Sequence, residues 1–175
     1  CQPAMAGAPR SGHHGRMSDS TPSIPTSTAL PRSYLFVPAS RPERIAKARQ
    51  SGADAVIVDL EDAVEPAAKA PARQALAEAA AALADAAPGT LWLRINALDT
   101  PHAADDLALL QRLIAGGALL GAMVPKAGDP AALQALPPGV PLLALVETAA
   151  GLGQAHRLGS VPAVQRLAFG SIDYA

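Results

Sequence analysis

The sequence predicts an α/β fold in which strands and helices alternate around a parallel sheet, as in a (β/α)8 TIM barrel. Two observations lead to this prediction. From about residue 31 onward, short apolar runs alternate with segments of helical character, a pattern typical of parallel strands joined by crossover helices. No G-x-G-x-x-G pattern follows the first run, which disfavours the alternative of an open, doubly wound dinucleotide-binding sheet.

The composition fits one soluble domain. The 175 residues are 50% hydrophobic and 17% charged, which argues against wholesale disorder, and only 3% are aromatic, so the core must be aliphatic and rich in alanine. The formal net charge of −1 gives no sign of a nucleic-acid or membrane partner. There is no apolar run of the roughly 20 residues that a membrane span needs. The single cysteine, Cys1, cannot form an internal disulfide, so a cytoplasmic location is expected.

Residues 1–30 are dominated by Ser, Thr, Pro, Gly and Ala and are predicted to form a disordered tail. The domain is then expected over residues 31–175. Its strands are predicted at the successive apolar runs: Tyr34–Val37, Ala55–Val58, Leu91–Ile95, Leu119–Val124, Leu142–Val146, and a sixth that starts at Leu167.

The helices are predicted between these runs. Ser40 and Glu43 have the spacing of a capping box, which predicts a helix from Ser40 to about Gln50. The others are expected from Pro66 to about Ala87, from Thr100 with Leu107, Leu110 and Ile114 on one face, from Asp129, and from Leu152 to about Leu158. The chain ends directly after the sixth strand, so we expect an incomplete barrel with about six of the eight strand–helix units.

Polar residues follow every predicted strand, at the edge where α/β barrels carry their chemistry. Glu147 and Asp173 follow two sequential strands, which are usually neighbours in a parallel sheet. Two nearby carboxylates repel each other unless a cation lies between them, and Mg²⁺ prefers such oxygen ligands. The alternative is that Glu147 caps the next helix and Asp173 merely begins a loop.

Arg94 ends the third predicted strand, where its guanidinium could bind a carboxylate ligand in bidentate fashion. The alternative is a structural ion pair with Asp59 or Glu61. These two acids and Asp62 follow the second strand and could hold metal-bound waters, or could simply pair with nearby arginines.

A set of cations flanks the first two strand ends: Arg41, Arg44, Lys69 and Arg73. They could bind the phosphates of a carrier such as coenzyme A. The alternative is that they lie on solvated helix faces, and this interpretation is favoured for Arg73.

Six segments in order carry a family resemblance: Arg32–Ala39, Arg41–Arg44, Gly52–Ala63, Arg94–Asn96, Val146–Ala149 and Phe169–Tyr174. Together they resemble the citrate lyase β-subunit-like proteins of the HpcH/HpaI aldolase superfamily, which include malyl-CoA and citramalyl-CoA lyases. The resemblance covers the chain from about Arg32 to the end.

The resemblance implies a TIM barrel that uses Mg²⁺ to cleave a carbon–carbon bond of a hydroxy acyl-CoA or citryl-type substrate, giving an oxo acid and an acyl thioester. It assigns Glu147 and Asp173 as metal ligands, with Glu147 also touching substrate, and Arg94 as the ligand of the oxo-acid carboxylate. Glu61 and Asp62 would hold metal-bound waters. Arg32 is implied for substrate, and Arg41, Arg44 and Lys69 for coenzyme A.

In such enzymes a further acid, often from the C-terminal part of a neighbouring subunit, handles protons, and this chain ends before that part. The full-length form is expected to be a homo-oligomer. Two alternatives stay open: an inactive metal- or acyl-CoA-binding protein, and a truncated, non-functional fragment. A half-open sheet would also expose apolar edges, so the free chain is expected to associate.

Overall fold

The computed structural model describes residues 31–85, 90–172 and 174. The described residues belong to one compact unit whose first residue is Pro31. The predicted tail, residues 1–30, and the predicted metal ligand Asp173 lie outside the described residues.

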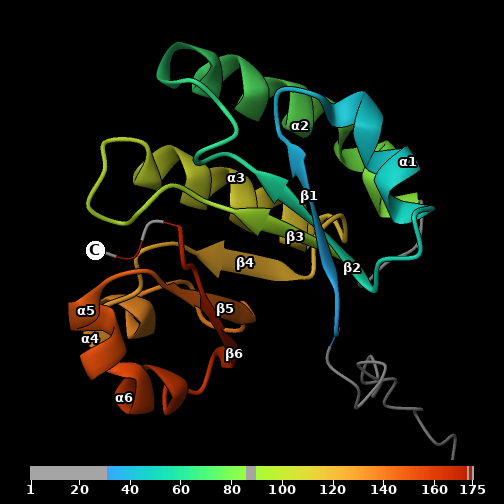
Figure 1. Cartoon of the computed structure of the whole chain (residues 1–175). Helices are drawn as coiled ribbons and strands as arrows, with labels where there is room; N and C mark the ends of the chain where they lie inside the picture. Colours follow the sequence, from blue (N-terminus) through green and yellow to red (C-terminus); the bar gives the residue numbers. More distant parts are fainter. Residues whose placement is uncertain (1–30, 86–89, 173, 175) are drawn as a thin grey trace, which may run out of the picture. The chain divides into compact units, whose positions relative to one another are not determined.

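Six parallel strands form one sheet in sequential order, β1 to β6, and each strand pairs with the next along the chain. Figure 1 shows the sheet curving from β1 round to β6. This architecture confirms the predicted α/β class and matches six successive strands of a barrel. The strands are β1 (Tyr34–Pro38), β2 (Ala55–Asp59), β3 (Leu91–Arg94), β4 (Gly121–Val124), β5 (Leu142–Val146) and β6 (Val164–Phe169).

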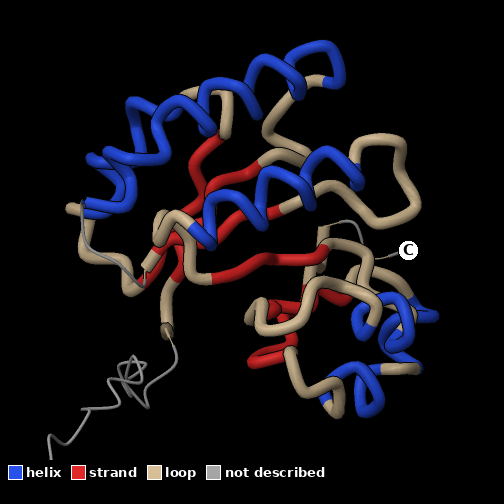
Figure 2. Tube along the Cα trace, turned by 180° about the vertical axis from the view of Figure 1, so that it is seen from behind, coloured by secondary structure: helices blue, strands red, loops and turns tan. Residues whose placement is uncertain are grey.

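The helices run between consecutive strands, outside the curved sheet (Figures 1 and 2). The longest are α2 (Lys69–Asp85) and α3 (Ala103–Ala115). The shorter ones are η1 (Pro42–Arg44), α1 (Ile45–Arg49), η2 (Pro66–Ala68), α4 (Pro130–Gln134), α5 (Ala149–Gly153) and α6 (Ala155–Gly159).

The alternation of side chains along the strands creates two apolar layers. Val56 and Val58 of β2 pack with the helices in the larger cluster. Ile57 of the same strand lies in a smaller cluster with Trp92 and Met123. Successive strand residues point to opposite faces, so the smaller cluster fills the inner face of the curved sheet. Strands β2 to β5 are therefore buried on both sides, which is why their sequences read as continuous apolar runs.

Several details differ from the sequence predictions, including the starts of β4 at Gly121 instead of Leu119 and of α3 at Ala103 instead of Thr100. The predicted capping box was wrong: the chain forms the 3-10 helix η1, its N-cap is Arg41 with no side-chain cap, and the Glu43 carboxylate accepts a hydrogen bond from Arg41 Nε at 2.6 Å. The predicted helix from Leu152 to Leu158 is two short helices, α5 and α6. Strand β6 starts at Val164, earlier than predicted, because its first residues include the polar Gln165 and Arg166, which obscure the apolar pattern. In the described part of the chain, no helix combines the length and the hydropathy of a membrane span.

Candidate active site

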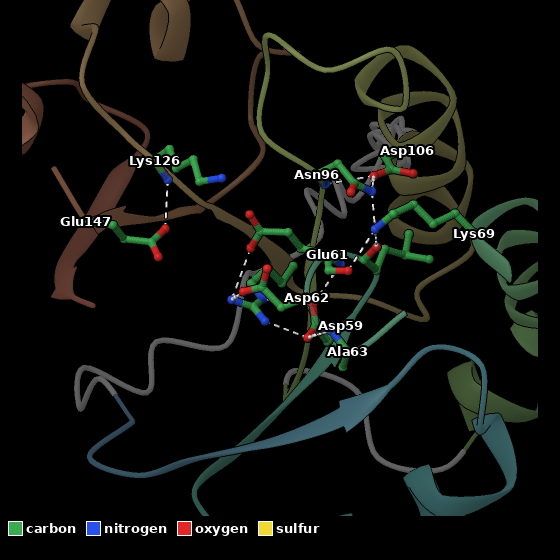
Figure 3. A network of polar contacts seen from close by, with 11 residues as sticks. Asp59, Glu61, Asp62, Ala63, Lys69, Asn96, Asp106, Lys126 and Glu147 are labelled. Carbon is green, nitrogen blue, oxygen red and sulfur yellow. Dashed lines mark hydrogen bonds and ion pairs between the residues drawn. The ribbon is translucent and has the colours of Figure 1, made fainter. Parts of the chain in front are cut away.

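The carboxyl ends of the parallel strands meet at one edge of the sheet, and most of the predicted polar residues lie there. Asp59 ends β2, Arg94 ends β3 and Glu147 directly follows β5. Glu61, Asp62 and Asn96 follow within two or three residues of a strand end. Figure 3 shows this group together with Lys126 and Glu147. The strand pattern thus brings acids and cations from four strands to a common edge.

Arg94 is fixed by its register partner on the neighbouring strand. Asp59 and Arg94 are paired positions of β2 and β3. The Asp59 carboxylate, 1% exposed, accepts hydrogen bonds from Arg94 Nε at 2.8 Å and from Nη2 at 2.6 Å. The Arg94 guanidinium also lies over the ring of Phe36, with Cζ 5.1 Å from the centroid. The structural ion pair, left open by the sequence, is therefore present.

The same guanidinium keeps a second edge for other partners. Its Nη1 atom lies 3.1 Å from Glu61 Oε2 and 3.1 Å from Asp62 Oδ2. These are ion pairs rather than aligned hydrogen bonds, and Glu61 Oε2 has no hydrogen-bond partner among the described residues. A guanidinium can bind carboxylates along two edges; here Asp59 takes the Nε–Nη2 edge, and Glu61 and Asp62 both lie against Nη1 on the other.

Negative charge exceeds positive charge at this point. Burial raises the pKa of Glu61 to about 7; the Arg94 charge lowers it only in part, and Asp62 and Glu147 raise it further. The positive charge of Arg94 offsets these influences on the Glu61 pKa only in part, because one guanidinium is shared among Asp59, Glu61 and Asp62. Burial alone lowers the pKa of Arg94, but the hydrogen bonds and charge of Asp59, with the charges of the other two acids, leave that pKa raised. Arg94 is thus charged at every working pH.

Glu147 is buried, 2% exposed, and its carboxylate is held from two sides. Its Oε1 accepts a hydrogen bond from the backbone N–H of Lys126 at 2.9 Å. Lys126 has a φ of 49°, in the left-handed region that disfavours residues other than glycine. Gly170, whose N–H donates to Val146, packs so closely that a Cβ there would lie 2.8 Å from Glu147 Cγ. Such local strain and close packing often accompany a functional group.

The chemistry of the donors suits a hard divalent cation. The acids offer carboxylate oxygens, the ligands that such cations prefer, and the pKa of Glu61 is raised chiefly by burial, with smaller contributions from the charges of Asp62 and Glu147. Among residues 31–85, 90–172 and 174, no three His, Cys, Asp or Glu side chains already converge as a metal site. The second expected ligand, Asp173, lies outside the described residues. Glu147 is the predicted ligand that the structure describes.

The other predicted cations occupy different places. Arg41 and Arg44 lie in or beside η1, just after β1, and both are exposed near the carboxyl edge. Lys69 is buried, and its Nζ donates to two main-chain carbonyls. Arg32 precedes β1 and pairs with Asp54, which precedes β2. It therefore lies at the amino edge of the sheet, away from the strand ends that carry Arg94 and Glu147.

Asp106 is a polar residue of this region that the sequence analysis missed. It is fully buried on α3 and accepts hydrogen bonds from the Asn96 backbone at 2.8 Å and from Asn96 Nδ2 at 2.7 Å. Arg73 donates to its other oxygen at 2.9 Å, so the solvated face favoured for Arg73 was wrong. Asp106 falls on the stripe of Leu110 and Leu113, and a carboxylate on an apolar stripe was the available signal.

A cavity of about 270 Å³ opens beside these residues. It lies between the loops that follow β2, β3 and β4, and its lining is mostly polar or charged. The residues that line it are Glu61, Asp62, Val64, Glu65, Pro66, Lys69, Asn96, Ala97, Thr100 and Lys126. A small molecule could therefore approach Glu61 and Asp62 from this side.

Six sequentially ordered parallel strands, with acids and an arginine at their carboxyl ends, have the architecture of a (β/α)8 barrel, in which the functional groups stand at this edge. The family is identified by comparison: residues 32–175 match the model of the HpcH/HpaI aldolase/citrate lyase family. The chain belongs to this family, as the six sequence segments predicted.

Individual relatives agree. The chain is 40% identical over 153 residues to a citrate lyase subunit beta-like protein of Deinococcus radiodurans, covering 83% of the chain and 53% of that protein. It is 36% identical over 144 residues to a (3S)-malyl-CoA thioesterase of Cereibacter sphaeroides, covering 82% of the chain and 50% of that protein. The chain thus spans about half the length of these curated relatives.

A solved structure has the same fold. The citrate lyase beta subunit of Mycobacterium tuberculosis, complexed with oxaloacetate and magnesium, aligns with a TM-score of 0.67 and 40% identity. The alignment covers 81% of this chain and 58% of that one. The fold prediction is therefore supported by an independent structure of a family member.

Proposed function

We propose that this chain provides the metal- and oxo-acid-binding half of a Mg²⁺-dependent carbon–carbon lyase. The substrate class is a hydroxy acyl-CoA or citryl-type thioester, and the products are an oxo acid and an acyl thioester. The observation that carries the proposal is the Arg94 guanidinium: one edge is fixed by Asp59, and the other faces Glu61 and Asp62. The magnesium and oxaloacetate bound by the Mycobacterium tuberculosis relative support the ligand class.

Each residue has a role in this proposal. Glu147 and Asp173 would hold the metal, and Glu61 and Asp62 would hold its water ligands. The Nη1–Nη2 edge of Arg94 would bind the carboxylate of the oxo-acid part and fix its orientation. Arg41 and Arg44 are exposed beside the carboxyl end of β1 and would bind the phosphates of coenzyme A.

Cleavage needs three changes in the substrate. The hydroxyl group loses its proton to a base, and its carbon becomes the carbonyl of the oxo acid. The carbon–carbon bond breaks, and its electron pair moves onto the thioester as an enolate, which then takes a proton at carbon. When bound, Mg²⁺ supplies Lewis-acid stabilisation of the developing negative charge. Arg94 would hold the departing oxo acid in place.

The test is a cleavage assay. Purified protein carrying this sequence is incubated with malyl-, citramalyl- and citryl-type thioesters, with MgCl₂ or with EDTA, and oxo acid and acyl thioester are quantified. Release of both products in equal amounts, abolished by EDTA, supports the proposal. If none of these substrates is cleaved in a metal-dependent way, the proposal is refuted. Binding without turnover would then indicate an inactive binding protein, and the absence of both binding and turnover would indicate a non-functional fragment.

Thioester hydrolysis is a second candidate, because one relative is named as a (3S)-malyl-CoA thioesterase. Hydrolysis would release free coenzyme A and the intact hydroxy acid, with no oxo acid. The same assay separates the two reactions, since a thiol reagent detects free coenzyme A and a hydrazine reagent detects the oxo acid.

We further propose a cytoplasmic homo-oligomer. Phe36 of β1 and Phe169 of β6 are 44% and 58% exposed on the two outermost strands, so the described part of the chain presents apolar surface that a further segment of the protein or another copy could cover. Unpaired apolar sheet edges favour association. Light scattering that found a monomer at all concentrations would contradict this part of the proposal.

A further inference from the structure

We propose that Lys69 is a positioning residue for Glu61 and Asp62, and that it does not bind the phosphates of coenzyme A. The inference rests on the proposed function and deepens it. It replaces the phosphate-binding role that the sequence suggested for this lysine, because the ammonium group is already committed inside the protein.

Lys69 is the first residue of α2 and is only 6% exposed. Its Nζ donates hydrogen bonds to the carbonyl oxygens of Leu60 and Glu61, both at 2.7 Å. A buried ammonium is unfavourable unless it is hydrogen-bonded, and these two carbonyls supply the bonds. To reach a phosphate in solvent, Lys69 would have to give up both contacts. These two hydrogen bonds therefore hold the Lys69 side chain at the turn after β2.

Asp59 holds the same turn through its amides. Its Oδ1 accepts the N–H of Glu61 at 2.8 Å, and its Oδ2 accepts the N–H of Ala63 at 3.1 Å. Lys69 therefore binds the carbonyl groups and Asp59 the amide groups of one short segment. With peptide groups on both sides of Glu61 fixed, the backbone that carries Glu61 and Asp62 has little freedom left.

Helix α2 reaches this turn by a second route. Asn96 Nδ2 donates to Leu60 O at 3.1 Å and to Asp106 at 2.7 Å, and Arg73 donates to Asp106 at 2.9 Å. Lys69 and Arg73 are four residues apart on α2 and so lie on one face. The helix is thereby coupled to the Leu60 carbonyl directly through Lys69 and indirectly through Asn96. Figure 3 shows Lys69, Asn96 and Asp106 of this network.

The consequence lies in the geometry of the acids. Glu61 and Asp62 each approach Arg94 Nη1 at 3.1 Å, so a small displacement of their backbone would change both contacts. Residues that orient metal-associated groups typically change metal affinity or activity by about 10- to 100-fold when they are replaced. Lys69 should therefore act on metal binding and turnover, not on affinity for coenzyme A.

The test compares Lys69→Met with Lys47→Met, which removes an exposed lysine of α1. Mg²⁺ alone and coenzyme A alone are titrated by calorimetry into each folded variant. We expect Lys69→Met to weaken Mg²⁺ binding about 10- to 100-fold and to leave coenzyme A affinity unchanged. Lost coenzyme A affinity with unchanged Mg²⁺ affinity would overturn the proposal. If Lys69→Met lowered the unfolding temperature but changed neither affinity, Lys69 would only stabilise the fold, and the proposal would be overturned.

Two further measurements keep the outcome decisive. If Lys69→Met does not fold, Asn96→Ala is used in its place, because it removes the other side-chain donor to Leu60 O. It should weaken Mg²⁺ binding and leave coenzyme A affinity unchanged. If the unmodified protein binds no Mg²⁺, the proposed function fails, and hydrogen exchange of the Glu61 and Ala63 amides then decides the inference. Exchange should accelerate in Lys69→Met and not in Lys47→Met; equal rates would overturn it.

Discussion

Asp59 and Arg94 face each other as register partners on β2 and β3, and the aspartate binds one edge of the guanidinium with hydrogen bonds of 2.8 and 2.6 Å. These hydrogen bonds hold the charged side chain of Arg94 in one position at the end of the buried strand β3. It also determines which edge of Arg94 can meet a ligand. Several measurable consequences depend on this arrangement and on its neighbours.

Replacing Arg94 with lysine should abolish tight binding of an oxo acid. Lysine keeps the charge but has no planar pair of edges, so it cannot bind Asp59 and a ligand carboxylate together. We expect about 100-fold weaker oxaloacetate binding in the presence of Mg²⁺, measured by calorimetry. Arg112→Lys, at an exposed position of α3, is the matched control. Equal affinities for the two variants would rule out Arg94 as the carboxylate ligand.

Asp59→Asn should be strongly destabilising. It leaves the Arg94 charge largely buried beside a neutral partner, and breaking a buried ion pair typically costs about 3 kcal/mol. Urea unfolding measures the change in the free energy of unfolding. Glu43→Gln breaks the exposed pair with Arg41 and should change that free energy far less, because solvent screens the two charges. Similar losses in both variants would show that the burial of Asp59 is unimportant.

Glu61→Gln should change how stability depends on pH. The folded-state pKa of Glu61 is raised to about 7, above the unfolded value, so the folded state holds its proton longer. The wild type therefore loses stability as pH rises from about 4.5 to 7, whereas the glutamine variant does not. In metal-free protein, the free energy of unfolding of the variant, relative to that of the wild type, should increase by about 2 kcal/mol between pH 5 and pH 8.

Thermal or urea unfolding at both pH values checks this prediction. Glu65→Gln, four residues away and exposed, serves as the control and should follow the wild type. A constant difference between Glu61→Gln and the wild type across this range would contradict the raised pKa.

Gly170→Ala should impair metal binding. The new Cβ would lie 2.8 Å from Glu147 Cγ and 3.1 Å from Oε2, so the carboxylate must shift. We expect about 10-fold weaker Mg²⁺ binding by calorimetry. Gly153→Ala adds a Cβ that meets nothing within 4 Å and should bind Mg²⁺ like the wild type. If both variants matched the wild type, Glu147 would not be a metal ligand in its described position.

The sequence by itself determined the fold class and the residues that stand at the strand ends. Apolar runs such as Val56–Val58 and Leu142–Val146 identify buried parallel strands, because both faces of such a sheet are covered. Since parallel strands end at a common edge, the same pattern placed Glu61, Arg94 and Glu147 together. The periodicity of side chains is a local property, and a single sequence contains it in full.

Only the tertiary structure decided which groups pair. It placed Arg32 at the opposite edge, turned Lys69 inward onto two carbonyls, and buried Arg73 against Asp106. It also divided the Arg94 guanidinium between Asp59 and the two acids of the next turn. Periodicity assigns a residue to a face, but a long side chain can reach several partners from that face. The partner it takes depends on distances across strands and between helices, which exist only once the chain is folded.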